Sequence, residues 1–351
     1  MSKKFNVMQV GLGPMGRIIA KLLIKRKNLN LKGVIDIDPQ LVGKKLSEIL
    51  DVEVGSNLRV KSNLDEILPS ESVDVVIIAT SSSLEKVAPI IKRVVRSGCD
   101  VISICEELSY PFQFYPKLSN ELDGLAKSNK VTIVGTGINP GFLMDLLPIT
   151  ITAPCQNVRS IKVVRMINSA KRRVSFQRKI GTGLTKKEFH QKISKGEITG
   201  HVGLKQSIQM IIAALGIQCD EIIEFSPIEI ITEKDFTTSY GEKVSKGYVC
   251  GLKSSAIANK GEKEIVILDF LAYAGEHEEY DSIDINGDPP IHQKVIGGIH
   301  GDLGTAAMVA NLIPKVIEAK SGLLTMKDLP VPCYTENLFK KKLNNIFDRN
   351  V

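Results

Sequence analysis

The chain has 351 residues, of which 43% are hydrophobic and 24% charged, and its formal net charge is +7. At about 150 residues per domain this length predicts two globular domains and excludes a single small module. The basic clusters at residues 21–27, 171–173 and 340–342 have no interleaved aromatic residues. They favour solvated surfaces over a nucleic-acid site.

The cysteines and the apolar runs indicate a cytoplasmic protein. The six cysteines contain no Cys-x-x-Cys pair, and a chain of this length does not need disulfides to fold. The apolar run at residues 5–10 is short and is broken by Asn6 and Gln9, so we do not expect it to be a signal peptide. No run approaches the roughly 18 apolar residues of a membrane span. We therefore expect free thiols and no membrane partner.

The first part of the chain alternates short β-branched runs with helical stretches, a pattern typical of βαβ units on a parallel sheet. We therefore predict a Rossmann-type doubly wound α/β domain over residues 1–148. The expected strands are residues 6–10, 31–36, 58–60, 73–79, 100–104 and 131–134, and the expected helices are residues 15–27, 84–97 and 116–128.

After Pro148 strand-like runs dominate, which predicts an α+β substrate and oligomerisation domain with a mixed or antiparallel sheet over residues 149–300. A largely β domain of this kind offers a sheet-to-sheet interface, so we expect a homodimer. An alanine-rich helix at residues 304–319 then brings residues 301–351 back to the first domain. The expected strands are 160–166, 221–231, 246–252 and 264–273, with helices at 186–193 and 204–215.

A glycine-rich turn lies between the first strand and the first helix. Residues 11–16 read G-L-G-P-M-G and match G-x-G-x-x-G. In such a turn the first glycine permits the tight bend, the second lets a pyrophosphate approach the backbone, and the third lets the helix close on the strand. The free N–H groups of the helix then point at phosphate. The predicted cofactor-binding residues here are Gly11, Gly13, Pro14, Met15 and Gly16.

Asp36 ends the second predicted strand, about 20 residues after the glycines, where an acidic side chain binds the adenosine ribose and favours NAD over NADP. A second interpretation is that Asp36 and Asp38 only cap a turn before Pro39. Lys44 and Lys45 follow closely and suit a 2′-phosphate, so the prediction is NAD or NADP.

The fourth strand ends in Thr80, Ser81 and Ser82, at the sheet edge where ligands bind in such folds. We assign these hydroxyls to the inner ribose and the nicotinamide. The alternative is that they cap the helix that begins at Leu84.

The fifth strand ends in Cys105, Glu106 and Glu107. Neighbouring strand residues point to opposite sides, so only one carboxylate enters a cleft. A carboxylate beside a nicotinamide can hold an ammonium group, accept its proton and activate the water that hydrolyses an imine. The pair therefore indicates oxidative deamination, with Glu106 favoured modestly over Glu107. Cys105 is not assigned as a nucleophile, because the neighbouring Glu explains the position better and no nucleophile elbow is present.

Residues 135–145 read G-T-G-I-N-P-G-F-L-M-D. This segment resembles the 2,4-diaminopentanoate dehydrogenase family and its amine dehydrogenase relatives. The C-E-E-L-x-Y-P turn, Gly-His-Val-Gly at residues 200–203 and the segment 301–306 resemble the same family, so the likeness covers residues 5–332.

The resemblance implies an NAD(P)-dependent amine dehydrogenase. It would convert 2,4-diaminopentanoate to 2-amino-4-oxopentanoate and ammonia in amino-acid metabolism, and the reverse reaction would be a reductive amination of ketones. It implies Glu106 or Glu107 as the catalytic group and Asn139 at the nicotinamide. The implied substrate-pocket residues are Pro140, Phe142, Leu147, His201, His277 and Thr305. The alternative is that these positions are structural, with Phe142 and Leu147 in the core and Thr305 capping the last helix. Cationic candidates for a substrate carboxylate are Arg165, Lys171, Arg172 and Arg173.

Two other functions stay open. The first half also resembles dihydrodipicolinate reductase, which would make the protein a cyclic-imine reductase, but the paired histidines and the D-x-P-S-G-T-A run of that family are missing. A non-catalytic nicotinamide sensor would leave the two glutamates unexplained. We predict no metal, because the five histidines are scattered without ligand spacing and hydride transfer to a nicotinamide needs none.

Overall fold

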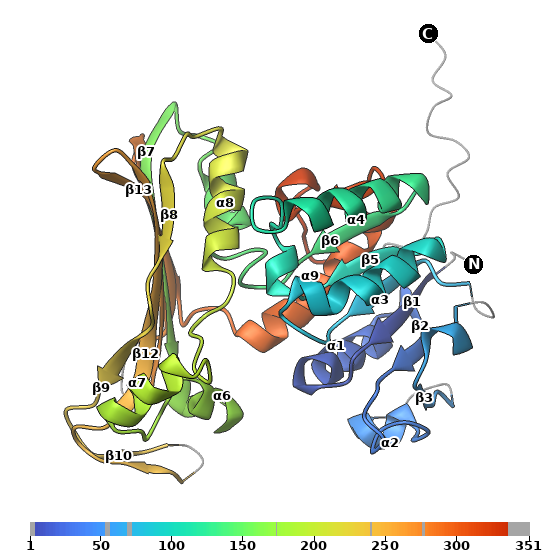
Figure 1. Ribbon diagram of the computed structural model, residues 1–351, viewed down its shortest axis with the longest axis horizontal. Helices are drawn as coiled ribbons and strands as arrows, with labels where there is room; N and C mark the ends of the chain where they lie inside the picture. Colours follow the sequence, from blue (N-terminus) through green and yellow to red (C-terminus); the bar gives the residue numbers. More distant parts are fainter. Residues whose placement is uncertain are drawn as a thin grey trace. The chain divides into compact units, whose positions relative to one another are not determined.

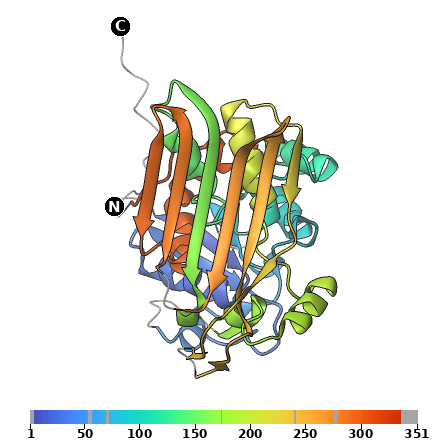
Figure 2. The ribbon, with the colours of Figure 1, turned by 90° about the vertical axis from the view of Figure 1, so that its left-hand side faces the viewer.

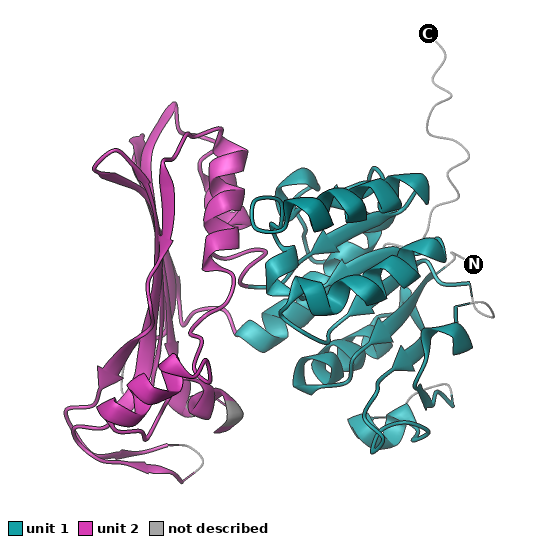
Figure 3. Cartoon of the chain, in the orientation of Figure 1, with its two compact units in different colours: residues 1–138, 301–351 teal, residues 139–300 magenta. Residues whose placement is uncertain are grey.

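The computed structural model describes residues 4–52, 57–68, 72–172, 174–238, 241–275 and 278–335. It divides into two compact units (Figure 3): unit 1 contains residues 1–138 and 301–351, and unit 2 contains residues 139–300. The chain thus enters unit 2 at Asn139 and not at the predicted residue 149. The reason is local packing, because α5 (Leu146–Ile151) packs against α8 (Leu204–Leu215) of unit 2.

Unit 1 is built on a seven-stranded sheet in which every pairing is parallel (Figure 1). Its strand order, β16-β6-β5-β4-β1-β2-β3, reverses between β1 and β4, as in a Rossmann domain. This confirms the predicted fold class. The strands are β1 (Phe5–Val10), β2 (Leu29–Ile35), β3 (Val60–Lys61), β4 (Val75–Ile78), β5 (Asp100–Ser103), β6 (Thr132–Gly135) and β16 (Gly322–Leu324).

Five helices of the described residues accompany this sheet, and their apolar spacing explains their packing. In α3, for example, Leu84, Val87, Ile91 and Val94 recur at three and four residues and all are buried. The alanine-rich α9 packs on α1 and on strands β4, β5 and β6, which is the return to the first domain that its composition predicts. The helices are α1 (Pro14–Lys25), α2 (Leu46–Leu50), α3 (Leu84–Arg96), α4 (Pro116–Ser128) and α9 (Gly301–Ile317), with 3-10 turns η1 (Leu64–Glu66), η2 (Glu106–Leu108) and η4 (Met326–Asp328).

Strand β16 was not predicted. It has only three residues, too few for a period-two pattern to be recognised, and it follows α9 closely. All three residues are buried, and the strand extends the parallel sheet beyond β6.

Unit 2 contains a second large sheet in the order β15-β14-β7-β13-β12-β8, with β9 also paired to β12. It is mixed, because β7 and β13 are parallel while the other pairs are antiparallel. The strands are β7 (Asn157–Asn168), β8 (Glu221–Glu224), β9 (Ile228–Ile231), β12 (Val249–Lys260), β13 (Lys263–Tyr273), β14 (Tyr280–Asp288) and β15 (Ile291–Ile296), beside a small hairpin of β10 (Phe236–Thr237) and β11 (Lys243–Val244).

The strands predicted for unit 2 differ from the structure in two respects. The single strand over residues 221–231 is two strands, separated at Pro227, which has no N–H to give to a sheet. Strands β14 and β15 were missed because they alternate apolar residues with Asp, Asn, His and Lys, so they contain no continuous apolar run.

Helices cover one face of this sheet. Buried Phe189 of α7 (Lys186–Ser194) packs in a cluster with Val249, Leu252 and Phe270, and α8 packs on β12 and β13. The remaining helical pieces of unit 2 are α6 (Val174–Lys179) and η3 (Ser169–Lys171). The opposite face carries no helix in Figure 2. We call this side of the sheet the open face. Phe270 and Ala272 face the helices, so Leu271, which lies between them in β13, projects from the open face.

All six cysteines are free thiols. Within the described ranges, no helix is both long and apolar enough to cross a bilayer. The predicted basic tail, including residues 340–342, lies outside those ranges.

Gly135 sets the distance between β6 and η2. A Cβ built on Gly135 would lie 2.6 Å from the backbone carbonyl carbon of Leu108. We expect Gly135→Ala to lower the free energy of unfolding by about 1–3 kcal/mol, because backbone atoms cannot move aside cheaply. Urea unfolding measures this.

Gly124→Ala in α4 is the matched control, since nothing lies within 4 Å of a Cβ there. Alanine is the better helix former, so the free energy of unfolding should rise by about 0.5–1 kcal/mol. An equal response of the two variants would contradict the close approach of β6 and η2.

Candidate active site

The three glycines of the turn after β1 differ in their surroundings as the fingerprint predicts. A Cβ on Gly11 would lie 2.3 Å from the carbonyl oxygen of Ala79, and one on Gly16 would lie 2.1 Å from that of Gly11. A Cβ on Gly13 would meet nothing within 4 Å. The turn is therefore closed at Gly11 and Gly16 and open at Gly13, which directly precedes α1. This shape fits a pyrophosphate on the helix N-terminus.

Two side chains fix the turn, and one of them was missed. The amide of buried Gln9 donates from Nε2 to the carbonyl oxygens of Gly11 (2.8 Å) and Gly16 (2.7 Å). Pro14 occupies the first position of α1, where a missing N–H costs nothing. The sequence did contain a signal for this role, because Gln9 is a polar residue near the end of a mostly apolar strand, just before the glycines.

Asp36 contacts the glycine-rich turn. Its Oδ2 accepts a hydrogen bond from the Leu12 N–H at 2.6 Å, and its Oδ1 accepts one from the Asp38 N–H at 2.9 Å. Asp36 therefore does cap the turn, as the second interpretation predicts. The carboxylate is only partly buried beside the glycines, so the predicted ribose role is compatible with this cap.

Thr80, Ser81 and Ser82 follow β4, which neighbours β1 in the sheet. Thr80 is exposed, and its Cγ2 would lie 3.0 Å from a Cβ on Gly11. These hydroxyls thus lie beside the glycine turn, where the strand order reverses and ligands bind in such sheets. No side-chain hydroxyl caps α3, contrary to the alternative; Ser81 Oγ instead accepts a hydrogen bond from the Ser83 N–H at 3.2 Å.

Glu107 supplies the cap of α3. Its Oε2 accepts a hydrogen bond from the Leu84 N–H at 2.7 Å, where the helix macrodipole also favours a negative charge. Tyr115 hydrogen-bonds to the same side chain, and burial together with this carboxylate raises the pKa of Tyr115. Glu107 is therefore part of the framework around η2, whereas Glu106 is the partly buried first residue of that turn.

Cys105 is inert in this setting. Its Sγ donates a hydrogen bond to the carbonyl oxygen of Ser82 at 3.1 Å. Burial raises the pKa of the thiol to about 12, so it stays protonated at neutral pH.

The segment after β6 changes units at Asn139. In unit 1, the Ile138 N–H donates to Thr305 Oγ1 at 3.2 Å. Thr305 lies inside α9, which begins at Gly301, so it is not the helix cap. In unit 2, the peptide bond between Asn139 and Pro140 is cis.

Asp145 is a framework residue that the sequence interpretation left without a role. Its fully buried carboxylate accepts hydrogen bonds from the Gly141 N–H (2.7 Å), the Leu146 N–H (2.6 Å) and Ser207 Oγ (2.8 Å). Burial raises its pKa and the three donors oppose that rise. The sequence signal for this role was the position of Asp145, an acidic residue within a mostly apolar stretch. Asp145 ties the segment that begins at Asn139 to α8.

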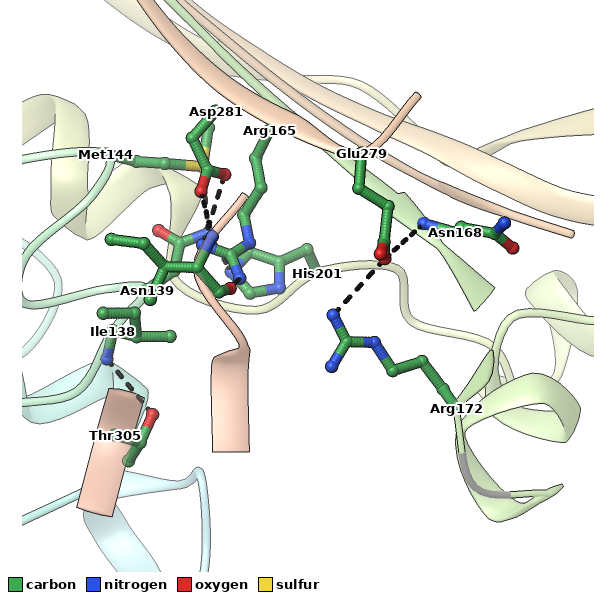
Figure 4. Close-up of polar contacts among 11 residues, drawn as sticks. Ile138, Asn139, Met144, Arg165, Asn168, Arg172, His201, Glu279, Asp281 and Thr305 are labelled. Carbon is green, nitrogen blue, oxygen red and sulfur yellow. Dashed lines mark hydrogen bonds and ion pairs between the residues drawn. The ribbon is translucent and has the colours of Figure 1, made fainter. Parts of the chain in front are cut away.

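Figure 4 shows the polar contacts around Asn139. Asn139 Nδ2 lies 2.8 Å from His201 Nε2 and 2.9 Å from Met144 Sδ. The His201 ring stacks on Phe270, with ring centroids 4.3 Å apart. Removal from water and the positive charge of Arg165 lower the pKa of His201 to about 3, so the ring is neutral at physiological pH.

Unit 2 holds two arginine–carboxylate pairs in this region. Arg165 is 2% exposed; its Nη1 lies 3.4 Å from Asp281 Oδ1 and its Nη2 donates to the Ile299 carbonyl oxygen at 2.7 Å. Burial lowers the pKa of Arg165 and raises that of Asp281. Arg172 pairs with Glu279 at 3.5 Å (Figure 4).

The structure thus groups most of the predicted residues within their own units. Unit 1 brings the glycine turn together with residues 80–82, and Glu107 joins them through the first turn of α3. Unit 2 brings Asn139 to His201, while Phe142 and Leu147 are partly buried and joined by a backbone hydrogen bond of 2.8 Å. His277 and Arg173 lie outside the described residues, as does the side chain of Lys171.

Comparison with known proteins adds to this geometry. Residues 142–345 match the C-terminal domain of 2,4-diaminopentanoate dehydrogenase, and residues 5–138 match the oxidoreductase family with an NAD-binding Rossmann fold. The chain is 34% identical over 335 residues to 2,4-diaminopentanoate dehydrogenase of Acetoanaerobium sticklandii, covering 94% of both chains. The chain belongs to the 2,4-diaminopentanoate dehydrogenase family.

Solved structures agree on the fold of this family member. An amine dehydrogenase from Mycobacterium smegmatis matches with a TM-score of 0.81 and 22% identity, covering 95% of this chain and 98% of the other. Dihydrodipicolinate reductase from Paenisporosarcina sp. TG-14 matches with a TM-score of 0.52 and 14% identity, covering 92% and 98%. The protein is an oxidoreductase with a Rossmann domain for NAD(P), as the glycine fingerprint predicts.

Proposed function

We propose that this chain catalyses the NAD(P)-dependent oxidative deamination of 2,4-diaminopentanoate to 2-amino-4-oxopentanoate, with release of ammonia. The same chemistry run backwards is a reductive amination of ketones. The observation that carries the proposal is the turn η2, which places Glu106 at the carboxyl edge of the unit 1 sheet while Glu107 holds the neighbouring helix. The family membership supports the choice of substrate.

The residues around the glycine turn fit the dinucleotide. Gly13 and the start of α1 would take the pyrophosphate, Asp36 the adenosine ribose, and Thr80, Ser81 and Ser82 the inner ribose and nicotinamide. When bound, the nicotinamide accepts the hydride that leaves the amine-bearing carbon. Exposed Ile37 follows Asp36 and brings no positive charge for a 2′-phosphate, which favours NAD.

The chain's own contribution is proton transfer and the activation of water. A carboxylate takes the proton of the substrate ammonium, which leaves a neutral amine whose lone pair assists hydride departure. The carboxyl group releases that proton to solvent, and the regenerated carboxylate then takes a proton from the water that attacks the imine carbon. It passes this second proton to the nitrogen, and ammonia leaves as the ketone forms. Overall, amine, NAD(P)⁺ and water give ketone, ammonia, NAD(P)H and one proton.

We assign this carboxylate to Glu106. Glu107 already accepts a hydrogen bond from the Leu84 N–H and one from Tyr115, so protonating it would weaken both contacts. A group that must gain and lose a proton in each turnover is better separated from a structural cap. The sequence favoured Glu106 only modestly. The role of Glu107 as the cap of α3 adds a reason to prefer Glu106.

Glu106→Gln should lower kcat for amine oxidation by about 100-fold or more, the usual contribution of a general base, while urea unfolding stays near that of the wild type. Glu107→Gln is the matched control. It should retain kcat within about tenfold but lower the free energy of unfolding by about 1–3 kcal/mol, because the cap of α3 is weakened. The reverse pattern would assign the chemistry to Glu107, and full kcat in both variants would refute the carboxylate mechanism.

The substrate carboxylate needs a cation, and Arg165 is the described candidate that fits best. Both arginines pair with a carboxylate, but Arg172 Nη2 donates a hydrogen bond to Glu279, whereas the buried Arg165 Nη1 lies at ion-pair distance from Asp281 and makes no hydrogen bond to any described residue. Arg165 lies close enough to His201 for its charge to lower the pKa of that ring. A guanidinium also binds a carboxylate through two parallel hydrogen bonds, which a lysine cannot do.

Arg165→Lys should raise KM for 2,4-diaminopentanoate by about 10- to 100-fold, the value of a charged hydrogen bond, and leave kcat/KM for a simple amine without a carboxylate within about threefold. Steady-state NADH formation with both substrates measures the difference. An equal loss of kcat/KM with the two substrates would mean that Arg165 only neutralises the charge of Asp281 and does not bind the substrate carboxylate.

We further propose that the protein works in the cytoplasm, where its nicotinamide cofactor is recycled, as a homodimer formed through the open face of the unit 2 sheet, without nucleic-acid or membrane partners. The paired register places Ile296, Tyr280, Met166 and Leu271 in one row across that face, and Lys253 continues the row to Ile228 at its far end. Ile296 is 80% exposed and Ile228 is 58% exposed. The run from Ile296 to Leu271 has no charged residue, and an exposed apolar patch of this kind is costly to leave in water.

Ile296→Lys should shift the protein toward the monomer, raising the dimer Kd by about tenfold or more, because the lysine would have to be desolvated in the interface. Sedimentation velocity over a concentration series measures this. Val331→Lys, at an exposed apolar residue of unit 1, is the control and should leave the Kd unchanged. A wild-type monomer at every concentration would rule out the dimer.

A further inference from the structure

The Asn139 amide lies beside two groups that can accept a hydrogen bond, Met144 Sδ and His201 Nε2. The sulfur of Met144 carries no hydrogen, so the amide atom 2.9 Å from it must be the NH₂ nitrogen and not the oxygen. The two ends of an amide have nearly the same shape, so hydrogen-bond partners decide its orientation. Met144 therefore fixes which end of the Asn139 amide is which.

His201 completes this constraint. The same Asn139 Nδ2 lies 2.8 Å from His201 Nε2, so that ring nitrogen must be the acceptor and the ring proton must be on Nδ1. A protonated ring would present a donor to a donor. The nearby charge of Arg165 and removal from water keep the ring neutral, and stacking on Phe270 keeps its plane in place.

The other end of the amide then has a defined task. Asn139 Oδ1 is buried and has no hydrogen-bond partner among the described residues. A buried acceptor without a donor costs about 1–3 kcal/mol, a cost that a ligand can relieve. An N–H donor in the ligand satisfies this oxygen, whereas a ligand carbonyl would be repelled.

We propose that Met144 and His201 are positioning residues that hold the Asn139 amide in one orientation, so that its Oδ1 selects a ligand N–H donor. This inference rests on the proposed function for the identity of that donor. The donor is either the carboxamide NH₂ of the nicotinamide or the reacting nitrogen of the amine. His201 thereby acts through Asn139 instead of lining the substrate pocket itself.

Two substitutions at His201 separate positioning from packing. His201→Phe keeps a ring to stack on Phe270 but removes the acceptor, so the amide is free to turn over. His201→Gln loses the ring but its Oε1 can accept from Asn139 Nδ2. We expect the phenylalanine variant to lose selectivity for the N–H donor and the glutamine variant to keep it, whereas a packing role predicts the opposite order.

Calorimetric titration with NADH and with its reduced 3-acetylpyridine analogue, which lacks the carboxamide N–H, tests the cofactor as the source. The wild type and His201→Gln should bind NADH about fivefold more tightly than the analogue, the value of one neutral hydrogen bond, and His201→Phe should bind the two alike. If the amine is the source, the cofactor ratio stays constant and KM for the amine rises about fivefold in His201→Phe only.

Equal losses in the two His201 variants, or a loss confined to His201→Gln, would overturn the proposal. If His201→Phe does not fold, Met144→Leu serves in its place, since it removes the sulfur acceptor at nearly constant volume and should reduce the same selectivity by about twofold.

Nitrogen-15 NMR of histidine-labelled protein provides a readout that does not depend on turnover. It should show a neutral His201 with its proton on Nδ1 down to about pH 5, and a proton on Nε2 would refute the constraint. Because the titrations and the NMR need no amine oxidation, failure of this inference is distinguishable from failure of the proposed reaction.

Discussion

The candidate site depends on a backbone constraint at the carboxyl edge of the unit 1 sheet. Three glycines lie so close to neighbouring backbone that a single methyl group would not fit: Gly11 against Ala79, Gly16 against Gly11, and Gly135 against Leu108. These contacts bring the turn after β1, the end of β4 and the turn η2 to one edge. Open space is left at Gly13, where a dinucleotide phosphate is expected.

Buried or partly buried polar groups hold the segments of each unit in place. Gln9 fixes the glycine turn, and Glu107 fixes the start of α3. In unit 2, Asp145 ties the segment after Asn139 to α8. Each accepts or donates at least two hydrogen bonds, so each resists motion in more than one direction.

The sequence predicted features that depend on short-range pattern. The glycine fingerprint, the helices α3, α4 and α8, and the alternation of strands and helices followed from periodicity within a few residues. Pattern alone could not find β16, with three residues, or β14, which alternates apolar residues with Asp and Asn. Those strands are defined by their neighbours in space, and a single sequence does not contain that information.

The same limit explains which site residues were found. Glu106, Glu107 and Asn139 lie in local motifs, so sequence reasoning reached them. The partners that give them separate roles lie far along the chain: Leu84 and Tyr115 for Glu107, and His201 for Asn139. Sequence could therefore name the candidates but could not show that Glu107 caps α3, because that contact is created only by the fold.

On the assignment proposed above, the reacting carboxylate of Glu106 lies beside Glu107, which caps a helix. A general base must change its protonation state, so a helix cap that depended on its negative charge would be weakened at each turnover. In η2, Glu107 bears the structural contacts through the Leu84 N–H and Tyr115, and the turn that it anchors positions Glu106. The neighbour thus supplies rigidity that the reacting carboxylate cannot supply for itself. We propose that Asn139 and His201 repeat the arrangement in unit 2, where a histidine ring that stays neutral orients the amide.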